Sequence, residues 1–283
     1  MIAITGASGQ LGRLVIAQLL EKVPASDIVA LVRDVNKVAD LSAKGVQVKA
    51  ADYNQPEALA SALQGVDKVL LISSSEVGQR AVQHRNVIDA AVKAGVKLVA
   101  YTSLLHADKS PLALAEEHRQ TETLLKDSGL PHVLLRNGWY TENYAASIPA
   151  ALEHGVFIGS AGEGKITSAT REDFAAAAVA VLTQEGQAGK VYELAGDEPY
   201  TLAELAAEVS KQSGKSISYQ NLSEAEFAAA LVSAGLPEGF AQIIADSDTG
   251  ASKGGLFDGG KQLSRLIGRP TTPLSAVVKE TLK

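Results

Sequence analysis

The 283-residue sequence predicts an α/β fold, with a doubly wound parallel sheet, and two observations together with one general rule lead to this prediction. Short apolar runs alternate with helical patterns from the first residues to about residue 136, which buries a parallel sheet beneath helices on both faces. Right-handed crossovers then determine how the chain winds. The first turn, Gly6-Ala7-Ser8-Gly9-Gln10-Leu11-Gly12, joins a strand to a helix. We expect a Rossmann-like parallel sheet followed by a second, smaller C-terminal α/β lobe.

Local patterns place the elements of the first part of the chain. Apolar runs predict strands at residues 1–5, 28–32, 46–50, 69–72, 96–101 and 133–136. Apolar residues at helical spacing predict helices at residues 11–20, 35–44, 76–94 and 110–128, with another helix starting near Pro56.

Beyond Tyr140 the order of elements becomes less regular. We expect helices at 143–154, 172–183 and 273–283, strands at 156–158 and 191–194, an extended piece at 166–169 and a mobile glycine-rich loop at 250–260. Thr201-Leu-Ala-Glu204 and Ser223-Glu-Ala-Glu226 are capping boxes that each open a helix. Residues 1–150 are assigned to the Rossmann domain, with 172–195 returning to it. Residues 151–283 are assigned to a smaller substrate-side lobe, with the substrate cleft expected between the two.

Composition limits the class of protein. Cysteine is absent, which excludes disulfides, thiolate metal sites and cysteine nucleophiles, and no histidine or carboxylate cluster predicts a metal site. The net charge of −6 argues against nucleic-acid binding. No apolar run approaches the roughly 20 residues of a membrane span. Because the first strand is predicted at the first residue, we expect no signal peptide and a cytoplasmic protein.

The glycine turn predicts a phosphate-binding site. Glycines let the backbone approach a ligand closely, and the unpaired N–H groups at a helix start favour a pyrophosphate. The Gly-x-x-Gly-x-x-Gly spacing is followed by a helix and a second buried strand. Together they form a βαβ unit of about 30 residues, the length of a dinucleotide half-site. A purely structural turn is the alternative.

Residues after the next strands indicate which dinucleotide binds. Arg33 follows the second strand and can form a paired contact with a 2′-phosphate, whereas an acid there would bind the ribose. Asp34 is adjacent, so NADH is the alternative to the predicted NADPH. Ser73-Ser74-Ser75 can bond the ribose and phosphates or cap the next helix, and the two roles are compatible. Asp52 can contact the adenine or fix its own loop.

Several segments together resemble the NmrA-like branch of the atypical short-chain dehydrogenases/reductases. They are Gly6-x-x-Gly9-x-x-Gly12, Arg33, Asp52-Tyr53, Ser73-Ser-Ser-Glu-Val-Gly-Gln79, Arg136-Asn-Gly-Trp-Tyr140 with Asn143, Ser168-x-Thr-Arg-Glu-Asp173 and Ala251-Ser-Lys-Gly-Gly-Leu-Phe257. The resemblance spans the chain. It is nearer to the bacterial NADPH-dependent quinone oxidoreductases and triphenylmethane-dye reductases of this branch than to the plant isoflavone reductases.

The resemblance implies roles for individual residues. The turn residues Gly6, Ala7, Ser8, Gly9, Gln10 and Leu11 would surround the pyrophosphate, and Arg33 would hold the 2′-phosphate. Ser73, Ser74 and Ser75 would line the path to the nicotinamide ribose. Gly138, Trp139, Tyr140, Thr141, Glu142 and Asn143 would flank the nicotinamide ring and face the substrate, and Arg171 would help to close the cofactor end of the cleft.

One departure from the family pattern affects the chemistry. Typical short-chain dehydrogenases carry Tyr-x-x-x-Lys on the helix after the fifth strand, whereas this helix reads Glu116-Glu-His-Arg-Gln-Thr-Glu122. Ser103 stays near the position of the family's catalytic serine. Alcohol oxidation and sugar epimerisation are therefore not expected. A quinone accepts hydride readily, so a site that orients its ring and offers one donor is sufficient.

Three residues are candidates for the group that donates to, or orients, the quinone. Asn143 is the first, Tyr140 the second and His118 the third. The alternative for Asn143 is the N-cap of the helix after it, because Asn is a strong cap. The alternative for His118 is a surface or capping histidine.

The predicted function is an NADPH-dependent two-electron reduction of a quinone to a hydroquinone. The alternatives are an NADP(H)-binding redox sensor of the NmrA type without turnover, and a triphenylmethane or azo dye reductase. The expected partner is a small-molecule quinone, without nucleic acid or a membrane span, and pairing into a homodimer is left open.

Overall fold

The computed structural model describes residues 1–283, which form two compact units. Unit 1 comprises Met1–Ala107, Glu116–Asn137 and Arg171–Tyr192, and unit 2 comprises Asp108–Ala115, Gly138–Thr170 and Glu193–Lys283. Residues 108–115, 138–150 and 193–195, which were predicted to belong to the first domain, fall in unit 2.

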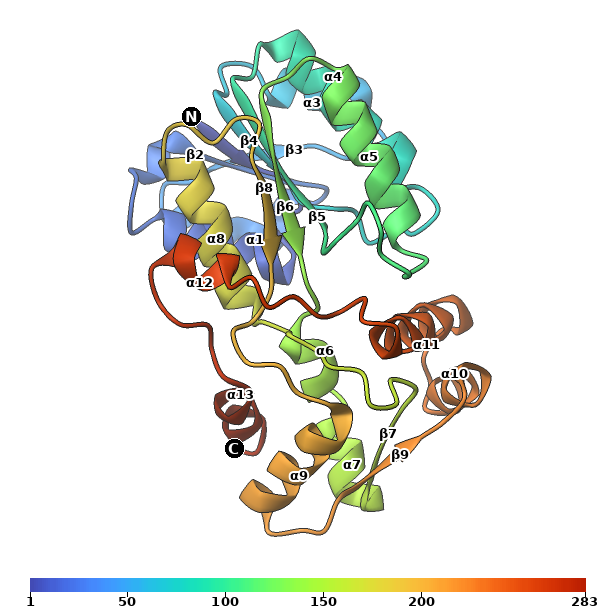
Figure 1. The fold of residues 1–283 in the computed structure, drawn as a ribbon. Coiled ribbons are helices and arrows are strands. Elements are labelled where there is room, and N and C mark those ends of the chain that lie inside the picture. Colours follow the sequence, from blue (N-terminus) through green and yellow to red (C-terminus); the bar gives the residue numbers. More distant parts are fainter. The chain divides into compact units, whose positions relative to one another are not determined.

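Unit 1 is built on a seven-stranded sheet with the order β3-β2-β1-β4-β5-β6-β8. The strands are β1 (Ile2–Ile4), β2 (Ile28–Val32), β3 (Gln47–Ala50), β4 (Lys68–Leu71), β5 (Leu98–Leu104), β6 (His132–Asn137) and β8 (Val191–Leu194). Neighbouring strands run parallel, with Ile2 opposite both Ile28 and Lys68. The chain winds outward from β1 in both directions, so the predicted doubly wound arrangement is confirmed (Figure 1). Ligands of such sheets bind beyond the carboxyl ends of the strands where the winding reverses, here beside β1.

Helices cover both faces of this sheet (Figure 1). They are α1 (Gln10–Leu19), α2 (Ala39–Ala43), α3 (Pro56–Ala62), α4 (Arg80–Ala94), α5 (Ala115–Asp127) and α8 (Arg171–Thr183), with short 3₁₀ turns η1 (Ala25–Asp27) and η2 (Val35–Val38). α1 and α8 pack side by side, α1 against β1 and β2 and α8 against β4 and β5. α3, α4 and α5 contribute side chains to the core on the opposite face.

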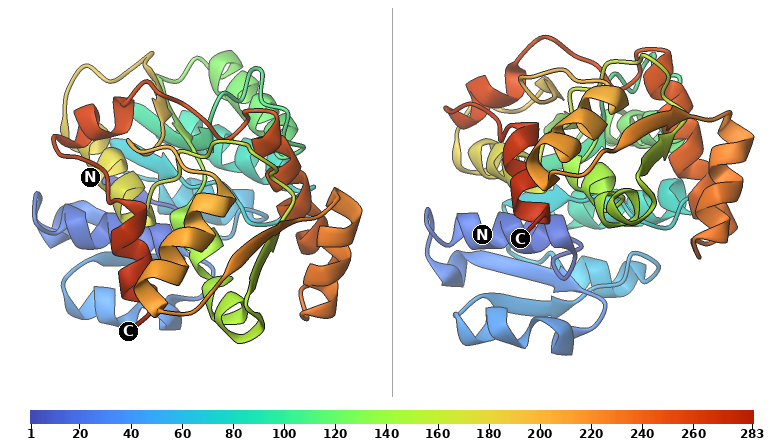
Figure 2. Two further views of the ribbon diagram at one scale, coloured as in Figure 1. Left: turned by 60° about the horizontal axis from the view of Figure 1, so that its bottom comes forward. Right: turned by 90° about the horizontal axis from the view of Figure 1, so that it is seen from below.

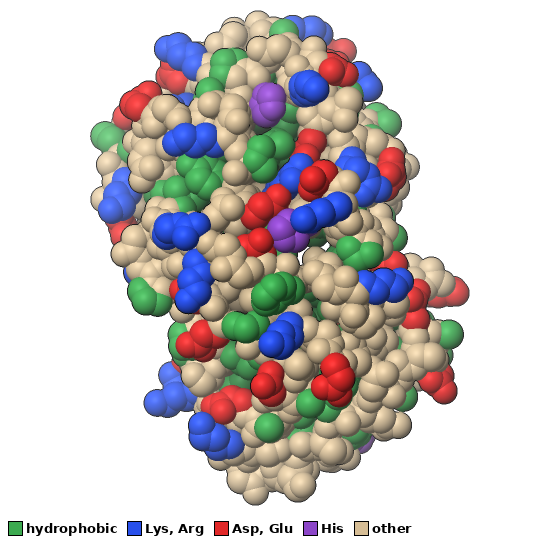
Figure 3. All heavy atoms as spheres, viewed as in Figure 1, with side chains coloured by type: hydrophobic (Ala, Val, Ile, Leu, Met, Phe, Trp, Pro, Cys, Tyr) green, Lys and Arg blue, Asp and Glu red, His purple; other side chains and the backbone are tan.

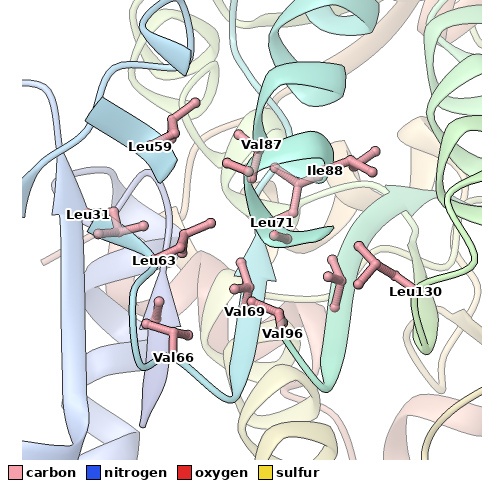
Figure 4. Packing of buried hydrophobic residues seen from close by; sticks show 14 of the residues in the cluster. Leu31, Leu59, Leu63, Val66, Val69, Leu71, Val87, Ile88, Val96 and Leu130 are labelled. Atoms are coloured by element: carbon pink, nitrogen blue, oxygen red, sulfur yellow. The ribbon is translucent and has the colours of Figure 1, made fainter. Parts of the chain in front are cut away.

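That core interlocks apolar side chains of strands and helices (Figure 4). Leu71 of β4 is fully buried together with Leu59 of α3 and Leu63 just after it, while Val87 and Ile88 of α4 are at most 2% exposed. Each such side chain stabilises the fold by roughly 1.5–3 kcal/mol relative to an exposed position. The core therefore fixes α3 and α4 on the sheet, and with them the segments that precede these helices.

Unit 2 contains a two-stranded parallel sheet and seven helices. Its elements are α6 (Thr141–Ala145), α7 (Ile148–His154), β7 (Val156–Gly159), α9 (Leu202–Ser213), β9 (Ser218–Asn221), α10 (Glu224–Ser233), α11 (Glu238–Ser252), α12 (Gln262–Ile267) and α13 (Leu274–Thr281). β7 pairs with β9, and α10 lies beside α11 (Figure 2). Both predicted capping boxes are confirmed, at Thr201 with Glu204 and at Ser223 with Glu226.

Two of the differences from the predicted bounds in unit 1 affect residues near Ser73–Ser75. The helix expected at 76–94 begins at Arg80, because Gly78 has φ +90° and interrupts helical geometry. Ser73–Ser75 therefore do not cap α4. β5 continues to Leu104 rather than ending at residue 101, which places Thr102 and Ser103 inside the sheet, both at most 4% exposed.

Asn143 is not a helix N-cap, so that alternative is wrong. The backbone N–H of Thr141 donates to Ala169 O at 2.9 Å, and this contact starts α6 at Thr141 with Tyr140 as the N-cap. The expected helix 143–154 is divided into α6 and α7. α7 begins at Ile148 with a proline in its first turn.

The loop expected at 250–260 is shorter than predicted, because residues 250–252 belong to α11. Gly250 lies in α11, and a Cβ there would come within 2.6 Å of Leu112 Cδ1, so this glycine allows close packing. Leu256 is fully buried, and its carbonyl accepts the N–H of Thr167 at 2.9 Å. Close packing at Gly250 and the buried Leu256 therefore anchor two points of the segment, and its mobility stays a prediction.

The surface carries charges of both signs. Basic and acidic side chains are interspersed on the face drawn in Figure 3 and form no single large basic patch there. No helix of the structure combines the length and apolar character that a membrane crossing needs.

Candidate functional site

The glycine turn after β1 has the geometry of an anion site. Gly6 has φ +58°, and Gly9 N donates to Gly6 O at 2.9 Å, which closes the turn. A Cβ at Gly12 would lie 2.5 Å from Gly6 O, so only glycine lets α1 approach the strand this closely. No side chain caps α1 and its first turn carries no acid. The N–H groups of the first turn of α1 therefore have no intrahelical acceptor, and together they form the positive end of the helix dipole.

The turn residues differ in what they can offer a ligand. Ser8, Gly9 and Gln10 are exposed, as a phosphate cradle requires. Ala7 is fully buried, and its N–H donates to Leu31 O at 3.2 Å. Ala7 therefore contributes packing within the turn rather than a backbone donor.

Arg33 follows β2 and keeps 68% of its side chain exposed. Its Nη1 lies 3.0 Å from Oε1 of Glu76. The neighbouring Asp34 accepts the N–H of Asn36 at 3.0 Å and so caps the short η2 turn. Asp52 accepts the N–H of Asn54 at 2.8 Å, which fixes its own loop as one of its two predicted roles requires.

Ser73–Ser75, the serine segment, follow β4 and are held by hydrogen bonds to their backbone. Ser73 N donates to Thr102 Oγ1 at 2.9 Å, and Ser74 N donates to Nε2 of His84 at the same distance. Arg80 Nε donates to Ser74 O at 2.6 Å. The backbone N–H and the carbonyl of Ser74 are therefore both bound by side chains of α4.

The hydrogen bonds of His84 define its tautomer. A backbone N–H can only donate, so Nε2 accepts from Ser74 and carries no hydrogen. Nδ1 then donates to Thr121 Oγ1 at 2.9 Å, and Thr121 donates to Glu117 O. Burial, followed by the nearby Arg80 charge, lowers the pKa of His84 to about 3. The ring therefore stays neutral, as an acceptor must.

The turn between Ser75 and α4 is anchored from α5. Oε1 of Glu117 accepts the N–H groups of Gly78 at 2.9 Å and of Arg80 at 3.1 Å. A carboxylate at this position satisfies N–H groups near the start of α4 and favours the helix dipole. The serine segment is thus held by Thr102 at its start and by Glu117 at the turn that follows it.

His118 is neither a surface nor a capping histidine, so that alternative is wrong. It is 5% exposed, and its Nδ1 lies 2.7 Å from the Tyr101 hydroxyl. α5 turns this face toward the core of unit 1, and sequence alone did not show which face is buried. Burial, with smaller contributions from Arg80 and His84, lowers the pKa of His118 to about 3.

The region of the family's Tyr/Lys pair holds a closed ion pair instead. Arg136 donates to Glu122 from Nε at 2.9 Å and from Nη2 at 2.7 Å. The Ser103 hydroxyl also donates to Glu122, at 2.6 Å. Because its hydrogen points to Glu122, Ser103 has only acceptor capacity toward another group.

In unit 2 the segment 138–143 is tied to residues 168–169. Trp139 O accepts the N–H of Ala169 at 3.1 Å, and the Thr141 hydroxyl lies 2.8 Å from that of Ser168. These contacts hold the entry to α6. Asn143 is exposed on α6, and Tyr140 and Glu142 are half-buried. Arg171, the remaining predicted site residue, is the first residue of α8 in unit 1.

Sequence reasoning missed the residues that support the serine segment, namely Thr102, His84, Arg80 and Glu117. One signal for His84 was present, since it lies one helical turn before Val87 and Ile88 and so shares their apolar face. Two buried polar atoms near the end of β6, Asn137 Oδ1 and Trp139 Nε1, have no hydrogen-bond partner within the protein. One is an acceptor and the other a donor, the two kinds of group that pair with a carboxamide.

Comparisons with known proteins agree with this geometry. A family described as NAD(P)H-binding matches residues 6–185, from the first glycine of the turn to just beyond α8. Quinone oxidoreductase 2 of Escherichia coli strain K12 is 67% identical over 278 residues, which are 98% of this chain and 97% of that protein.

Solved structures show the same relationship. An NADPH-dependent quinone oxidoreductase from E. coli in complex with NADPH superposes with a TM-score of 0.98 and 66% identity, covering 100% of both chains. The triphenylmethane reductase of Citrobacter sp. in complex with NADP(H) gives a TM-score of 0.96 and 44% identity, again over 100% of both chains. The predicted resemblance to both kinds of reductase is confirmed, and the chain belongs to the NAD(P)H-binding family.

Proposed function

We propose that this chain is an NADPH-dependent oxidoreductase that reduces a quinone to the hydroquinone in one two-electron step. The observation that carries this proposal is the 67% identity to an E. coli quinone oxidoreductase over 98% of the chain. The aligned residues make up 98% of this chain and 97% of that protein, so the relationship covers both units and not the dinucleotide-binding part alone.

The residues present fit a dinucleotide. The φ of +58° at Gly6 and the close packing of Gly12 against Gly6 O, which a Cβ would approach to 2.5 Å, support a compact turn whose backbone is open to a ligand. The N–H groups of residues 10–12 are the ones that α1 cannot satisfy internally. They would hold the pyrophosphate, and the Arg33 guanidinium would hold the 2′-phosphate.

The remaining contacts follow the chain. Ser73–Ser75 would line the nicotinamide ribose, and Gly138–Asn143 would flank the nicotinamide. Arg171 would act at the cofactor end of the site. The unpartnered Asn137 Oδ1 and Trp139 Nε1 would suit the amine and carbonyl of the nicotinamide carboxamide.

When bound, the reduced nicotinamide supplies the hydride. The protein must then orient the quinone and stabilise the oxygen that gains negative charge. The exposed Asn143 amide is the first candidate for this donor, and the Tyr140 hydroxyl is the second. His118 is the weakest candidate, because a pKa of about 3 leaves it neutral and its Nδ1 already contacts Tyr101.

A triphenylmethane dye is the second candidate substrate class, and the 44% identity to a triphenylmethane reductase over the whole chain supports it. A cationic dye and a quinone both accept a hydride, so the same residues would serve either substrate. The ratio of kcat/KM for a benzoquinone to that for a triphenylmethane dye separates the two.

The test is the oxidation of NADPH, followed by its absorbance, with and without p-benzoquinone and beside NADH at matched concentration. We expect a quinone-dependent rate that is higher with NADPH. A rate equal to the buffer control at full cofactor occupancy would overturn the enzyme proposal. Binding without turnover would instead support a redox sensor, which should prefer a partner protein in one cofactor state.

The cellular setting is part of the same proposal. We place the protein in the cytoplasm as an enzyme that acts on a small-molecule quinone and not on nucleic acid. Pairing into a homodimer stays a prediction, and light scattering coupled to size exclusion measures it directly.

A further inference from the structure

One ion pair joins the ends of two strands that flank β1. Arg33 follows β2 and Glu76 follows β4, and these strands are the two neighbours of β1 in the sheet. Their side chains meet at 3.0 Å between Nη1 and Oε1. The pair thus links the two sides of the strand that leads into the glycine turn.

Glu76 is held in this position from its other side as well. Its Oε2 accepts from Nε2 of Gln83 at 2.7 Å, and Gln83 is only 2% exposed. The backbone N–H of Glu76 donates to the Ser74 hydroxyl at 3.1 Å. The carboxylate therefore has one oxygen bound by the buried Gln83 of α4 and the other directed at Arg33.

We propose that Glu76 is an internal counter-ion that the 2′-phosphate of NADPH must displace from Arg33, so that Glu76 sets the affinity ratio of NADPH to NADH. This inference rests on the proposed role of Arg33. A carboxylate and a phosphate compete for the same planar set of guanidinium donors. NADH has no 2′-phosphate, so its binding needs no exchange.

The charges determine the direction of the effect. With 68% and 43% of the two side chains exposed, the pair is weak and easily exchanged. After the exchange, the carboxylate of Glu76 remains near the bound phosphate and repels it. Glu76 therefore lowers the affinity for NADPH and leaves that for NADH unchanged.

The test is Glu76→Gln in the full chain, with dissociation constants for NADPH and NADH measured by calorimetric titration. Gln keeps the size of the side chain and an acceptor for Gln83, but loses the charge. We expect NADPH to bind about two- to five-fold more tightly, the range of an exposed ion pair, and NADH to stay within about two-fold. Glu21→Gln, an exposed acid after the far end of α1, is the control for net charge.

Arg33→Ala and the double variant separate this inference from the function on which it rests. Arg33→Ala should weaken NADPH about tenfold or more and barely affect NADH. If it does not, the proposed phosphate site is wrong. If Arg33→Ala weakens NADPH but Glu76→Gln does not tighten it, only the counter-ion role is overturned. An equal gain from Glu76→Gln with and without Arg33 would also overturn the exchange, since the effect must pass through Arg33.

Discussion

One ring nitrogen of His84 determines how the Ser74 peptide is held. Nε2 accepts the Ser74 N–H, and Nδ1 is engaged by Thr121. His84 is fully buried, so water cannot replace it as an acceptor. We therefore regard His84 as a positioning residue for the serine segment.

Replacing His84 with Leu leaves a buried N–H without an acceptor. We expect a loss of about 1–3 kcal/mol in the free energy of unfolding and a several-fold rise in KM for NADPH, with a smaller change in kcat. His84→Gln returns an acceptor at a similar distance and should recover most of the KM. Denaturant unfolding and steady-state kinetics measure the two effects.

Val87→Ala is the matched control, one helical turn further along α4 and equally buried. It should lower stability without raising KM. If Val87→Ala and His84→Leu raise KM equally, the effect comes from general loosening of α4 and not from the Ser74 contact.

Removal of the Asn143 side chain tests its proposed role as the donor to the quinone oxygen. In Asn143→Ala we expect kcat with p-benzoquinone to fall by about 10–100-fold, because the donor acts on the oxygen that gains charge. The dissociation constant for NADPH should change much less. Tyr140→Phe provides the comparison, and a larger loss of kcat in Tyr140→Phe than in Asn143→Ala would reverse the proposed order.

α11 and α6 are joined by a buried carboxylate, Asp248. The Tyr144 hydroxyl donates to its Oδ1 at 2.8 Å, and Ser160 N donates to its Oδ2 at 3.0 Å. Burial outweighs these two bonds and raises the pKa of Asp248 from 3.8 to about 6. The neutral acid is therefore favoured in the folded state, and ionising it at neutral pH costs stability.

The pH dependence of this cost has a definite sign. Between pH 3.8 and about 6 the folded state binds the proton and the unfolded state does not, so the stability due to Asp248 falls as pH rises. Asp248→Asn removes this pH-dependent cost, because asparagine does not ionise. Its Oδ1 can accept from Ser160 N and its amide can donate to the Tyr144 hydroxyl, so both contacts can be retained.

The free energy of unfolding of Asp248→Asn, relative to that of the unmodified protein, should therefore rise by about 2–3 kcal/mol from pH 4 to pH 7. Denaturant unfolding at a series of pH values checks this difference. A difference that is constant with pH would show that Asp248 is ionised in the folded state throughout.

Elements were predicted well where the signal is local. Both capping boxes, the β8 bounds and the alternation of strands with helices depend on residues close in sequence. The start of α4 was predicted four residues too early, at Glu76 instead of Arg80, because Gly78 has a positive φ and its N–H is bound by Glu117 of α5. The length of β5 was underestimated because Thr102 and Ser103 are polar yet buried.

For the protein as a whole, cofactor binding and folding are linked. A ligand that binds only the folded state stabilises it by about 2.7 kcal/mol at a hundredfold excess over its dissociation constant. We expect NADPH to raise the melting temperature more than NADH does at equal concentration, as measured by scanning calorimetry. Equal shifts from the two dinucleotides would contradict the selection of NADPH by Arg33.

The calorimetric traces also report on the two units. Most of the proposed phosphate contacts, including the glycine turn and Arg33, belong to unit 1. If the units melt separately, the transition that NADPH shifts most identifies the unit that holds these contacts. Glu76→Gln should enlarge the shift with NADPH and leave the shift with NADH unchanged.

The sequence alone determined the class of fold and the dinucleotide turn, and its resemblance to known reductases predicted the residues near the cofactor. The fold class and the turn follow from apolar periodicity, glycine spacing and the residues that follow each strand, all of which are local. Only the tertiary structure decided which side chains support them. The partners Ser74 with His84, Ser73 with Thr102 and Arg33 with Glu76 come from different elements. Their meeting depends on the order of strands and on which face of α4 is buried, and both are set by packing of the whole sheet.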